Sequence, residues 1–315
     1  MEKVIMISPP PASFEAIWGD GRLVKEFNYE VAPGIDINRT TGAGGFGEDF
    51  KMNTGEYKGK TLKWLYDNHP EYFGTNEERR WEIIPVAMGV AYACADLSVQ
   101  VHPTEEWSMK NLGTHGKSEC WYFVDCPKNA NVVMGHNAKT MEELDDYIAR
   151  KDWEGLIKRY PIEPGSFYAI KAGTLHAIQK DSYFIEICNP NPVTYRFYDY
   201  DRLDRDGKPR YVDIDKAKEN ILIPFNEIKY ERKITNYGGV KETCLADNED
   251  YSAWLYNVKG EGTVEVKKPF GGCYVIEGNG TVEGLDIKAG ESFFITREGR
   301  NITITGDMTI LCCHG

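Results

Sequence analysis

The sequence contains one β-type unit twice, and this repeat constrains the fold more than any other feature. Residues 162–171 align with residues 287–296, and residues 120–124 align with residues 273–277. The two aligned segments lie farther apart in the first copy, by about the length of the helical stretch expected between them. A repeated supersecondary unit indicates a duplicated architecture. We therefore predict two copies of a β unit, with a helical insertion only in the first.

Short runs of aromatic and β-branched residues, interrupted by glycine and proline, dominate the rest of the chain. These residue types favour strands, and the 31 glycines suit a fold with many turns. Many short strands indicate a barrel or a sandwich. Together with the repeat, this pattern predicts a mainly β protein of two β-barrels. We expect residues 1–215 to form the first barrel, with a helical insertion at about 139–160, and residues 216–315 to form the second.

Three stretches have helical periodicity instead, at residues 60–68, 140–159 and 213–223. The second begins at Thr140, with Glu143 three residues later, which is the spacing of a capping box. The third lies in the connection between the two predicted barrels.

The charge balance and the apolar pattern exclude several classes of partner. The formal net charge of −12 argues against a protein that binds nucleic acid or an anionic membrane. No apolar run approaches the roughly 20 residues that a membrane span needs. The apolar block at the amino terminus is too short for the core of a secretory signal. We therefore expect a cytoplasmic protein with a small-molecule partner.

The eight cysteines are scattered and include no Cys-x-x-Cys pair, which also suits the cytoplasm and argues against a structural zinc site. Cys120, Cys188 and Cys273 fall in apolar runs and are expected to be small buried hydrophobic residues. Cys312 and Cys313 lie near the carboxyl terminus, and we assign them no role.

Three places in the sequence supply side chains that bind metals. Alternate side chains of a strand share one face, so Gln100 and His102 are expected to project together. Glu119 begins an apolar strand, where a carboxylate needs an ionic partner, a metal or a position at the strand end. A tight turn at Gly173 delivers His176 into the next apolar strand.

Two histidines, one glutamate and Gln100 make a mixed nitrogen and oxygen site. Such a site suits a catalytic zinc better than a structural one. Taken singly, a strand histidine is more often a hydrogen-bonded barrel residue, and Glu119 is equally well a salt-bridged strand end. The remaining histidines are expected at the surface: His69, His115, His136 and His314.

The repeat shows which of the two copies carries the candidate ligands. In the second copy, Asn301 stands at the position of His176, and Gly272 stands at the position of Glu119. The ligand types are therefore present in the first copy and absent from the second. This pattern predicts one active barrel and one structural barrel.

With these residues, the chain resembles the type I mannose-6-phosphate isomerases of the short bacterial kind. Six segments carry the resemblance, and they span nearly the whole chain: residues 17–19, 55–62, 97–103, 116–122, 173–177 and 194–202. The segments around His102, Glu119 and Arg196, in this order, are specific to that family. The resemblance implies a cupin (jelly-roll) fold and one zinc ion per chain. It also implies that His102, Glu119 and His176 bind the zinc, with Gln100 as a fourth ligand.

The resemblance also implies an activity, the interconversion of mannose 6-phosphate and fructose 6-phosphate through an enediol. Zinc would polarise the sugar oxygens, and Arg196, at the family's active-site arginine, would hold negative charge on the phosphate or the enediolate. Lys117 matches a lysine that serves the substrate. The alternatives are a salt bridge from Arg196 to Asp199 or Asp201, and a solvated loop position for Lys117. A metal-bound water, Lys117 and Glu48 are all candidates for the proton carrier.

Four positions depart from the family pattern. Phe50 replaces a tryptophan, Gly89 a lysine, Pro192 an aspartate and Lys171 a proline. We expect these departures on the substrate side of the pocket. They favour two alternatives, a non-catalytic sugar-phosphate-binding protein on the same scaffold and an isomerase of a different sugar phosphate. Two histidines and a carboxylate also suit non-haem iron, so a cupin iron oxidoreductase is a third alternative.

Overall fold

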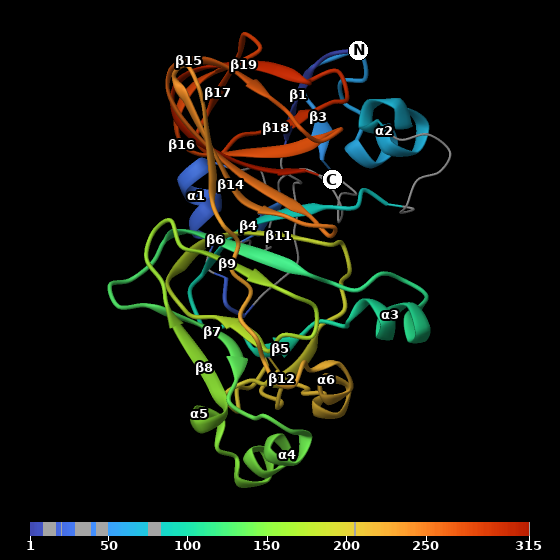
Figure 1. The fold of residues 1–315 in the computed structure, drawn as a ribbon, viewed down its shortest axis with the longest axis vertical. Helices are drawn as coiled ribbons and strands as arrows, with labels where there is room; N and C mark the ends of the chain where they lie inside the picture. Colours follow the sequence, from blue (N-terminus) through green and yellow to red (C-terminus); the bar gives the residue numbers. More distant parts are fainter. Residues whose placement is uncertain are drawn as a thin grey trace.

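The computed structural model consists of two stacked β units (Figure 1). It describes residues 1–8, 17–19, 21–28, 39–41, 50–74, 83–204 and 206–314. A nine-stranded sheet forms one unit, and two five-stranded sheets form the other. Strands dominate the chain, so the prediction of a mainly β protein is confirmed.

Strand order defines three sheets. Sheet I runs β13 (Lys233–Tyr237), β14 (Val240–Asp247), β15 (Ser252–Glu265), β19 (Asn301–His314), β16 (Gly271–Val282), β18 (Ser292–Ile295), β1 (Val4–Ser8) and β3 (Lys51–Met52), with β17 (Leu285–Lys288) beside β16. Sheet II runs β12 (Tyr195–Tyr198), β5 (Val99–Val101), β10 (His176–Ile178), β7 (Asn131–His136) and β8 (Ile157–Pro161). Sheet III runs β2 (Arg39–Thr41), β4 (Ala87–Ala93), β11 (Ser182–Cys188), β6 (Glu119–Asp125) and β9 (Phe167–Ile170).

The helices are short and lie around the sheets (Figure 1). They are α1 (Arg22–Phe27), α2 (Leu62–Asn68), the 3₁₀ helix η1 (Pro70–Phe73), α3 (Glu105–Leu112), α4 (Met141–Arg150), α5 (Trp153–Leu156) and α6 (Ile214–Asn220). The hydroxyls of Thr61 and Thr140 cap α2 and α4, and the carboxylate of Asp213 caps α6. Among the described residues, no helix is long and apolar enough to cross a membrane.

The helical stretch expected at residues 140–159 is divided into two helices and the start of a strand. Helix α4 ends because Lys151 adopts a left-handed conformation with φ of 53°, and the side chain of Asp152 then caps α5. The predicted helical stretch is therefore interrupted at Lys151. Ile157 begins β8, so its apolar side chain belongs to a strand and not to the helical face that its spacing suggested.

Sheet III lies in the middle of the molecule, and this explains its composition. On one side, Phe123 and Phe184 pack against residues of sheet II such as Met134, which forms the core of the first barrel. On the other side, Val90 and Ile187 share a second core with residues of sheet I. All seven residues of β4 are buried, because a strand covered on both faces needs a continuous apolar sequence.

The first strand of the chain belongs to sheet I, beside the last part of the sequence. Strand β1 pairs antiparallel with β18, with Val4 opposite Ile295, and its other edge pairs with β3. Ile5 and Ile7 of β1 are buried in the core between the two units. Residues near the amino terminus therefore complete the sheet that residues 233–314 otherwise form.

The expectation that His136 and His314 lie at the surface was wrong, and Cys273, although buried as expected, is not a free thiol. Both histidines are buried. His136 Nε2 bonds to the backbone carbonyl of Leu222 at 3.0 Å, and His314 Nδ1 bonds to that of Phe270 at 3.1 Å. These bonds satisfy the ring nitrogens in the interior. Cys273 and Cys312 form a disulfide, since they lie directly opposite each other on the paired strands β16 and β19. Long-range register brings these cysteines together, and their local sequence gives no indication of it.

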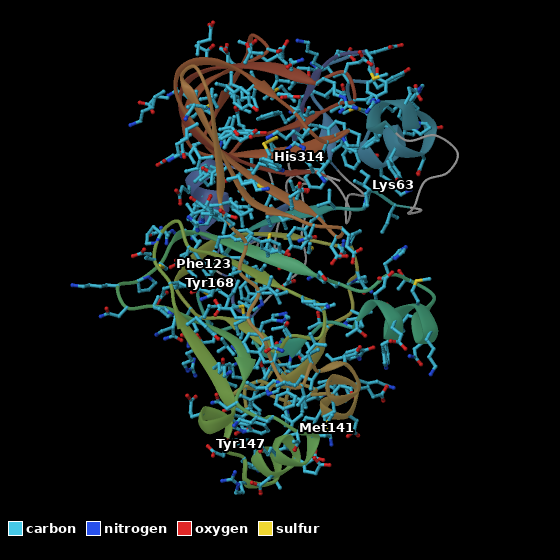
Figure 2. All side chains as sticks on the ribbon, in the orientation of Figure 1. Lys63, Phe123, Met141, Tyr147, Tyr168 and His314 are labelled. Carbon is cyan, nitrogen blue, oxygen red and sulfur yellow. A yellow bond between two sulfur atoms is a disulfide. The ribbon has the colours of Figure 1, made fainter. Side chains whose placement is uncertain are left out.

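Burial of His314 predicts a specific pH dependence of stability (Figure 2). Burial lowers the pKa of His314 from 6.5 to about 4, so below pH 6.5 the unfolded chain binds a proton that the folded chain does not. Stability should therefore fall as the pH drops from 6.5 toward 4, by roughly 3 kcal/mol from this residue. Urea unfolding of the wild type and of His314→Asn at several pH values would measure this. A pH slope of equal size in both proteins would contradict the prediction.

Candidate metal centre and pocket

Three buried side chains converge between sheets II and III. His102 follows β5, His176 begins β10, and Glu119 begins β6 on the facing sheet. One ligand atom from each lies within 4.8 Å of the others. Glu119 Oε2 is 3.3 Å from His102 Nε2, and Glu119 Oε1 is 3.5 Å from His176 Nε2. In the described part of the chain, no other three His, Cys, Asp or Glu side chains form such a cluster.

Backbone carbonyls orient both imidazole rings toward this cluster. His102 Nδ1 lies 2.9 Å from the carbonyl oxygen of Val193, and His176 Nδ1 lies 2.8 Å from that of Thr174. Each Nδ1–H therefore donates to a carbonyl, which leaves the Nε2 lone pair directed at Glu119. Burial lowers the pKa of His176 to about 4, so this ring is neutral at pH 7 and able to bind a metal ion.

Glu119 is ionised although it is fully buried. Burial raises its pKa, but the nearby Lys117 ammonium and the two imidazoles outweigh that effect and hold the pKa well below 4.5. Lys117 Nζ lies 2.9 Å from Glu119 Oε2, so the carboxylate also has the ionic partner of a salt-bridged strand end. A buried carboxylate that faces two imidazole nitrogens is nevertheless a donor set that fits a divalent metal ion.

Gln100 lies in the same row of side chains. Strand pairing places Arg196 opposite Gln100, and Gln100 opposite His176, across β12, β5 and β10. The amide nitrogen of Gln100 is 3.4 Å from His176 Nε2. Gln100 and His102 both line the same pocket, and the Gln100 amide is within reach of the cluster.

Lys117 is buried, so the alternative of a solvated loop lysine does not hold. Its side chain is 8% exposed, and its Nζ lies 2.9 Å from Glu119 Oε2 and 3.2 Å from Glu186 Oε1. Glu186, on β11, was not identified from the sequence. The available signal was a single carboxylate in the otherwise apolar run of residues 183–187, which requires a buried partner.

A pocket of about 320 Å³ opens beside the cluster. Its polar lining includes His102, Gln100, Lys117, Glu186, Arg196 and Arg210. Both predicted substrate residues, Lys117 and Arg196, therefore face the space next to the metal cluster. Arg210 is a further lining residue that sequence reasoning missed.

The two pocket arginines are held by different partners. Arg196 Nη1 donates to the carbonyl of Tyr211 at 2.6 Å, while Asp199 binds Arg210 at 2.9 Å and also Arg202. Among the described residues, the alternative of a salt bridge from Arg196 to Asp199 or Asp201 is not formed. Burial, followed by the positive charge of Arg210, lowers the pKa of Arg196. Two neighbouring guanidinium groups in a partly buried pocket are suited to an anion.

The chain is similar to known proteins over most of its length. The family description "Mannose-6-phosphate isomerase, cupin domain" matches residues 241–315. Mannose-6-phosphate isomerase ManA of Bacillus subtilis is 36% identical over 276 residues, which cover 86% of this chain and 85% of the relative.

The chain belongs to the mannose-6-phosphate isomerase family.

Other members of the mannose-6-phosphate isomerase family agree with this placement. The enzyme of that name from Streptococcus mutans is 30% identical, with 95% of this chain and 94% of the relative covered. The crystal structure of the mannose 6-phosphate isomerase from Bacillus subtilis superposes with a TM-score of 0.90 at 31% identity over the whole of both chains. The phosphomannose isomerase of Salmonella typhimurium, at 14% identity and a TM-score of 0.77, shares the fold. The cupin architecture is therefore confirmed.

In this member of the mannose-6-phosphate isomerase family, the second barrel carries no ligand type at the two described positions that match Glu119 and His176. Glu119 of β6 pairs with Ile170, and the residue that pairs with the equivalent Ile295 is Gly271. By strand register, the residue equivalent to Glu119 is therefore Gly271 and not Gly272, the residue that the sequence alignment gave. Both are glycines, so neither can bind a metal ion through its side chain. Asn301 begins β19 as His176 begins β10.

The positions that depart from the family pattern lie in different surroundings. Phe50 is buried in the core between the two units. Gly89 pairs with Glu186 across β4 and β11, and Pro192 precedes Val193, whose carbonyl orients His102. Among the described residues, none of these three lines the pocket. Glu48, a predicted candidate for proton transfer, lies outside the described residues.

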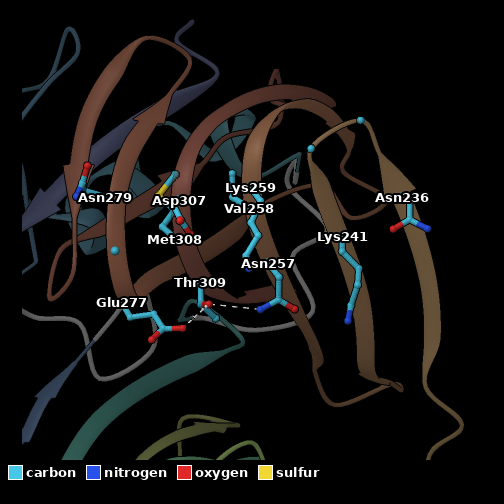
Figure 3. A pocket seen from close by; sticks show the side chains of 13 residues that line it. Asn236, Lys241, Asn257, Val258, Lys259, Glu277, Asn279, Asp307, Met308 and Thr309 are labelled. Carbon is cyan, nitrogen blue, oxygen red and sulfur yellow. Dashed lines mark hydrogen bonds between the residues drawn. The ribbon is translucent and has the colours of Figure 1, made fainter.

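A larger groove of about 1020 Å³ lies on sheet I, away from the metal cluster (Figure 3). Its polar side chains bond to one another: Asn257 donates to Thr309 at 3.3 Å, and Thr309 donates to Glu277 at 2.8 Å. None of the predicted site residues lines this groove. The convergence of predicted residues therefore selects the smaller pocket as the candidate active site.

Proposed function

We propose that the chain is a zinc-dependent aldose–ketose isomerase that interconverts mannose 6-phosphate and fructose 6-phosphate. The observation that carries this proposal is the buried His102–Glu119–His176 cluster beside a pocket with two guanidinium groups. The cluster would bind one zinc ion per chain, with Gln100 as the fourth ligand. Because the substrate is a phosphorylated sugar, we also propose a cytoplasmic location.

The chemistry is divided between the metal and the side chains of the pocket. When bound, zinc supplies a Lewis acid that polarises the carbonyl and hydroxyl oxygens of the sugar. Arg196 and Arg210 would hold the phosphate, because their charges repel each other and an anion between them relieves that repulsion. Phosphate binding at this end of the pocket orients C1 and C2 toward the cluster.

Lys117 and Glu186 are the groups best placed to handle the proton that moves between C1 and C2. They lie 3.2 Å apart and both line the pocket. In this pair the Lys117 ammonium can donate a proton and the Glu186 carboxylate can accept one, so an acid and a base lie within one hydrogen bond. Lys117 thus stays a candidate for the proton carrier, and Glu186 joins it.

The position of Lys117 and Arg196 favours an isomerase over a non-catalytic binding protein. If either side chain pointed away from the cluster, a binding protein would be the better hypothesis, but both line the pocket with His102. An iron oxidoreductase shares the ligand types, and metal analysis distinguishes it.

A coupled assay tests the proposal directly. Purified, zinc-loaded protein should convert mannose 6-phosphate to fructose 6-phosphate, a chelator should abolish turnover, and added zinc should restore it. Absence of turnover with a full metal complement would favour a different sugar phosphate or a binding protein. Restoration by iron and not by zinc would favour the oxidoreductase.

A further inference from the structure

A loop of the second barrel contacts the backbone of Glu119, a residue of the candidate metal cluster in the first. Residues 248–251 connect β14 to β15, and the hydroxyl of Tyr251 donates a hydrogen bond of 2.8 Å to the backbone carbonyl of Glu119. Tyr251 is 4% exposed and Glu119 is 1% exposed, so this bond is shielded from water. A residue of the barrel that lacks metal ligands thus contacts the backbone of a predicted ligand.

The same loop also holds the residue before Glu119. The backbone carbonyl of Asp250 accepts a hydrogen bond from the amide nitrogen of Asn189 at 2.9 Å. Asn189 in turn binds Ser118 twice, accepting from its backbone N–H at 3.2 Å and donating its own N–H to the Ser118 carbonyl at 3.0 Å. Two consecutive residues, Ser118 and Glu119, are therefore tied to one loop of the second barrel.

The loop is itself rigid enough to act as a support. Asn248 Oδ1 accepts from the backbone N–H of Asp250 at 2.8 Å and of Tyr251 at 3.0 Å, which makes a tight side-chain-stabilised turn. The Asn248 amide also donates to the hydroxyl of Tyr230 at 3.0 Å. Burial raises the pKa of Tyr251 well above its ordinary value, so its hydroxyl stays protonated and remains a donor.

We propose that Tyr251 is a positioning residue for the metal centre, and that the second barrel uses it to fix the backbone from which Glu119 projects. The inference rests on the proposed function, because it takes Glu119 to be a metal ligand. Glu119 is the first residue of β6, and a strand end is held less firmly than a strand centre. A buried carbonyl at that end needs a partner, and the partner's position sets where the carboxylate lies.

The test compares two hydroxyl deletions at the same interface. Tyr251→Phe removes the bond to Glu119. Tyr183→Phe is the matched control, because the Tyr183 hydroxyl bonds to that of Tyr274 at 3.0 Å. Tyr183 pairs with Asp125, at the opposite end of β6 from Glu119. Zinc affinity is measured by competition with a fluorescent chelator, and stability by thermal unfolding of the metal-free proteins.

We expect both variants to lose similar stability, and only Tyr251→Phe to bind zinc about tenfold more weakly, as for other groups that orient a ligand. Amide hydrogen exchange at residues 118–120 should also speed up in Tyr251→Phe alone. Zinc affinity within twofold of wild type in Tyr251→Phe, or an equal loss in both variants, would overturn the inference. If the wild-type protein itself bound no zinc, the proposed function would fail first and this inference with it.

Discussion

Replacing His176 with alanine is expected to remove the bound metal and the isomerase activity together. His176 is buried, and its Nε2 faces the carboxylate of Glu119 at 3.5 Å, so its loss removes one of the two imidazole ligands of the cluster. Without the third ligand, the metal loses both affinity and its Lewis-acid geometry. We expect turnover to fall by at least about a thousandfold. Metal content per chain and turnover should be measured on the same preparation.

His136→Ala is the matched control for this variant. His136 is also a buried barrel histidine, but its Nε2 bonds to the carbonyl of Leu222 and lies outside the cluster. This control should lose stability while keeping its metal. If His176→Ala retained both metal and activity, the assignment of the centre would be wrong.

Replacing Arg196 with alanine is expected to spare the metal and to reduce turnover. The guanidinium lines the pocket, and its Nη1 is held by the carbonyl of Tyr211 at 2.6 Å, so the group is positioned to contact an anionic substrate. Loss of a charge-assisted contact that orients a phosphate should lower kcat/KM by about a hundredfold. Steady-state kinetics and metal analysis together measure both effects.

Arg159→Ala serves as the control for Arg196→Ala, because Arg159 pairs with Glu154 outside the pocket. It should keep wild-type kinetics. Loss of metal from Arg196→Ala would show that this arginine supports the cluster and does not serve the substrate.

The sequence predicts side-chain directions well where they depend on a single strand. The alternation of side chains put Gln100 and His102 on one face, and the repeat identified the barrel without ligands. Glu186 was not predicted as a pocket residue, because its partner Lys117 lies 69 residues away in the sequence. Its contact depends on how β11 and β6 pair, which no local pattern specifies.

The same limit explains the errors elsewhere in the fold. His136 and His314 stand in segments that look polar or terminal, but distant carbonyls satisfy their ring nitrogens in the interior. Cys273 and Cys312 are 39 residues apart and meet only through the register of two long strands. Side-chain type and spacing predict strand faces well. They do not predict which distant strands become neighbours.

The pairing of β1 with β18 has a consequence for how the protein is made. During synthesis on the ribosome, residues 4–8 emerge long before their partner, residues 292–295. Until then, β1 can pair only with the short strand β3, and its other edge is open to aggregation. A fusion or a shortening at the amino end would therefore act on the barrel farthest away in the sequence, by uncovering the edge of β18.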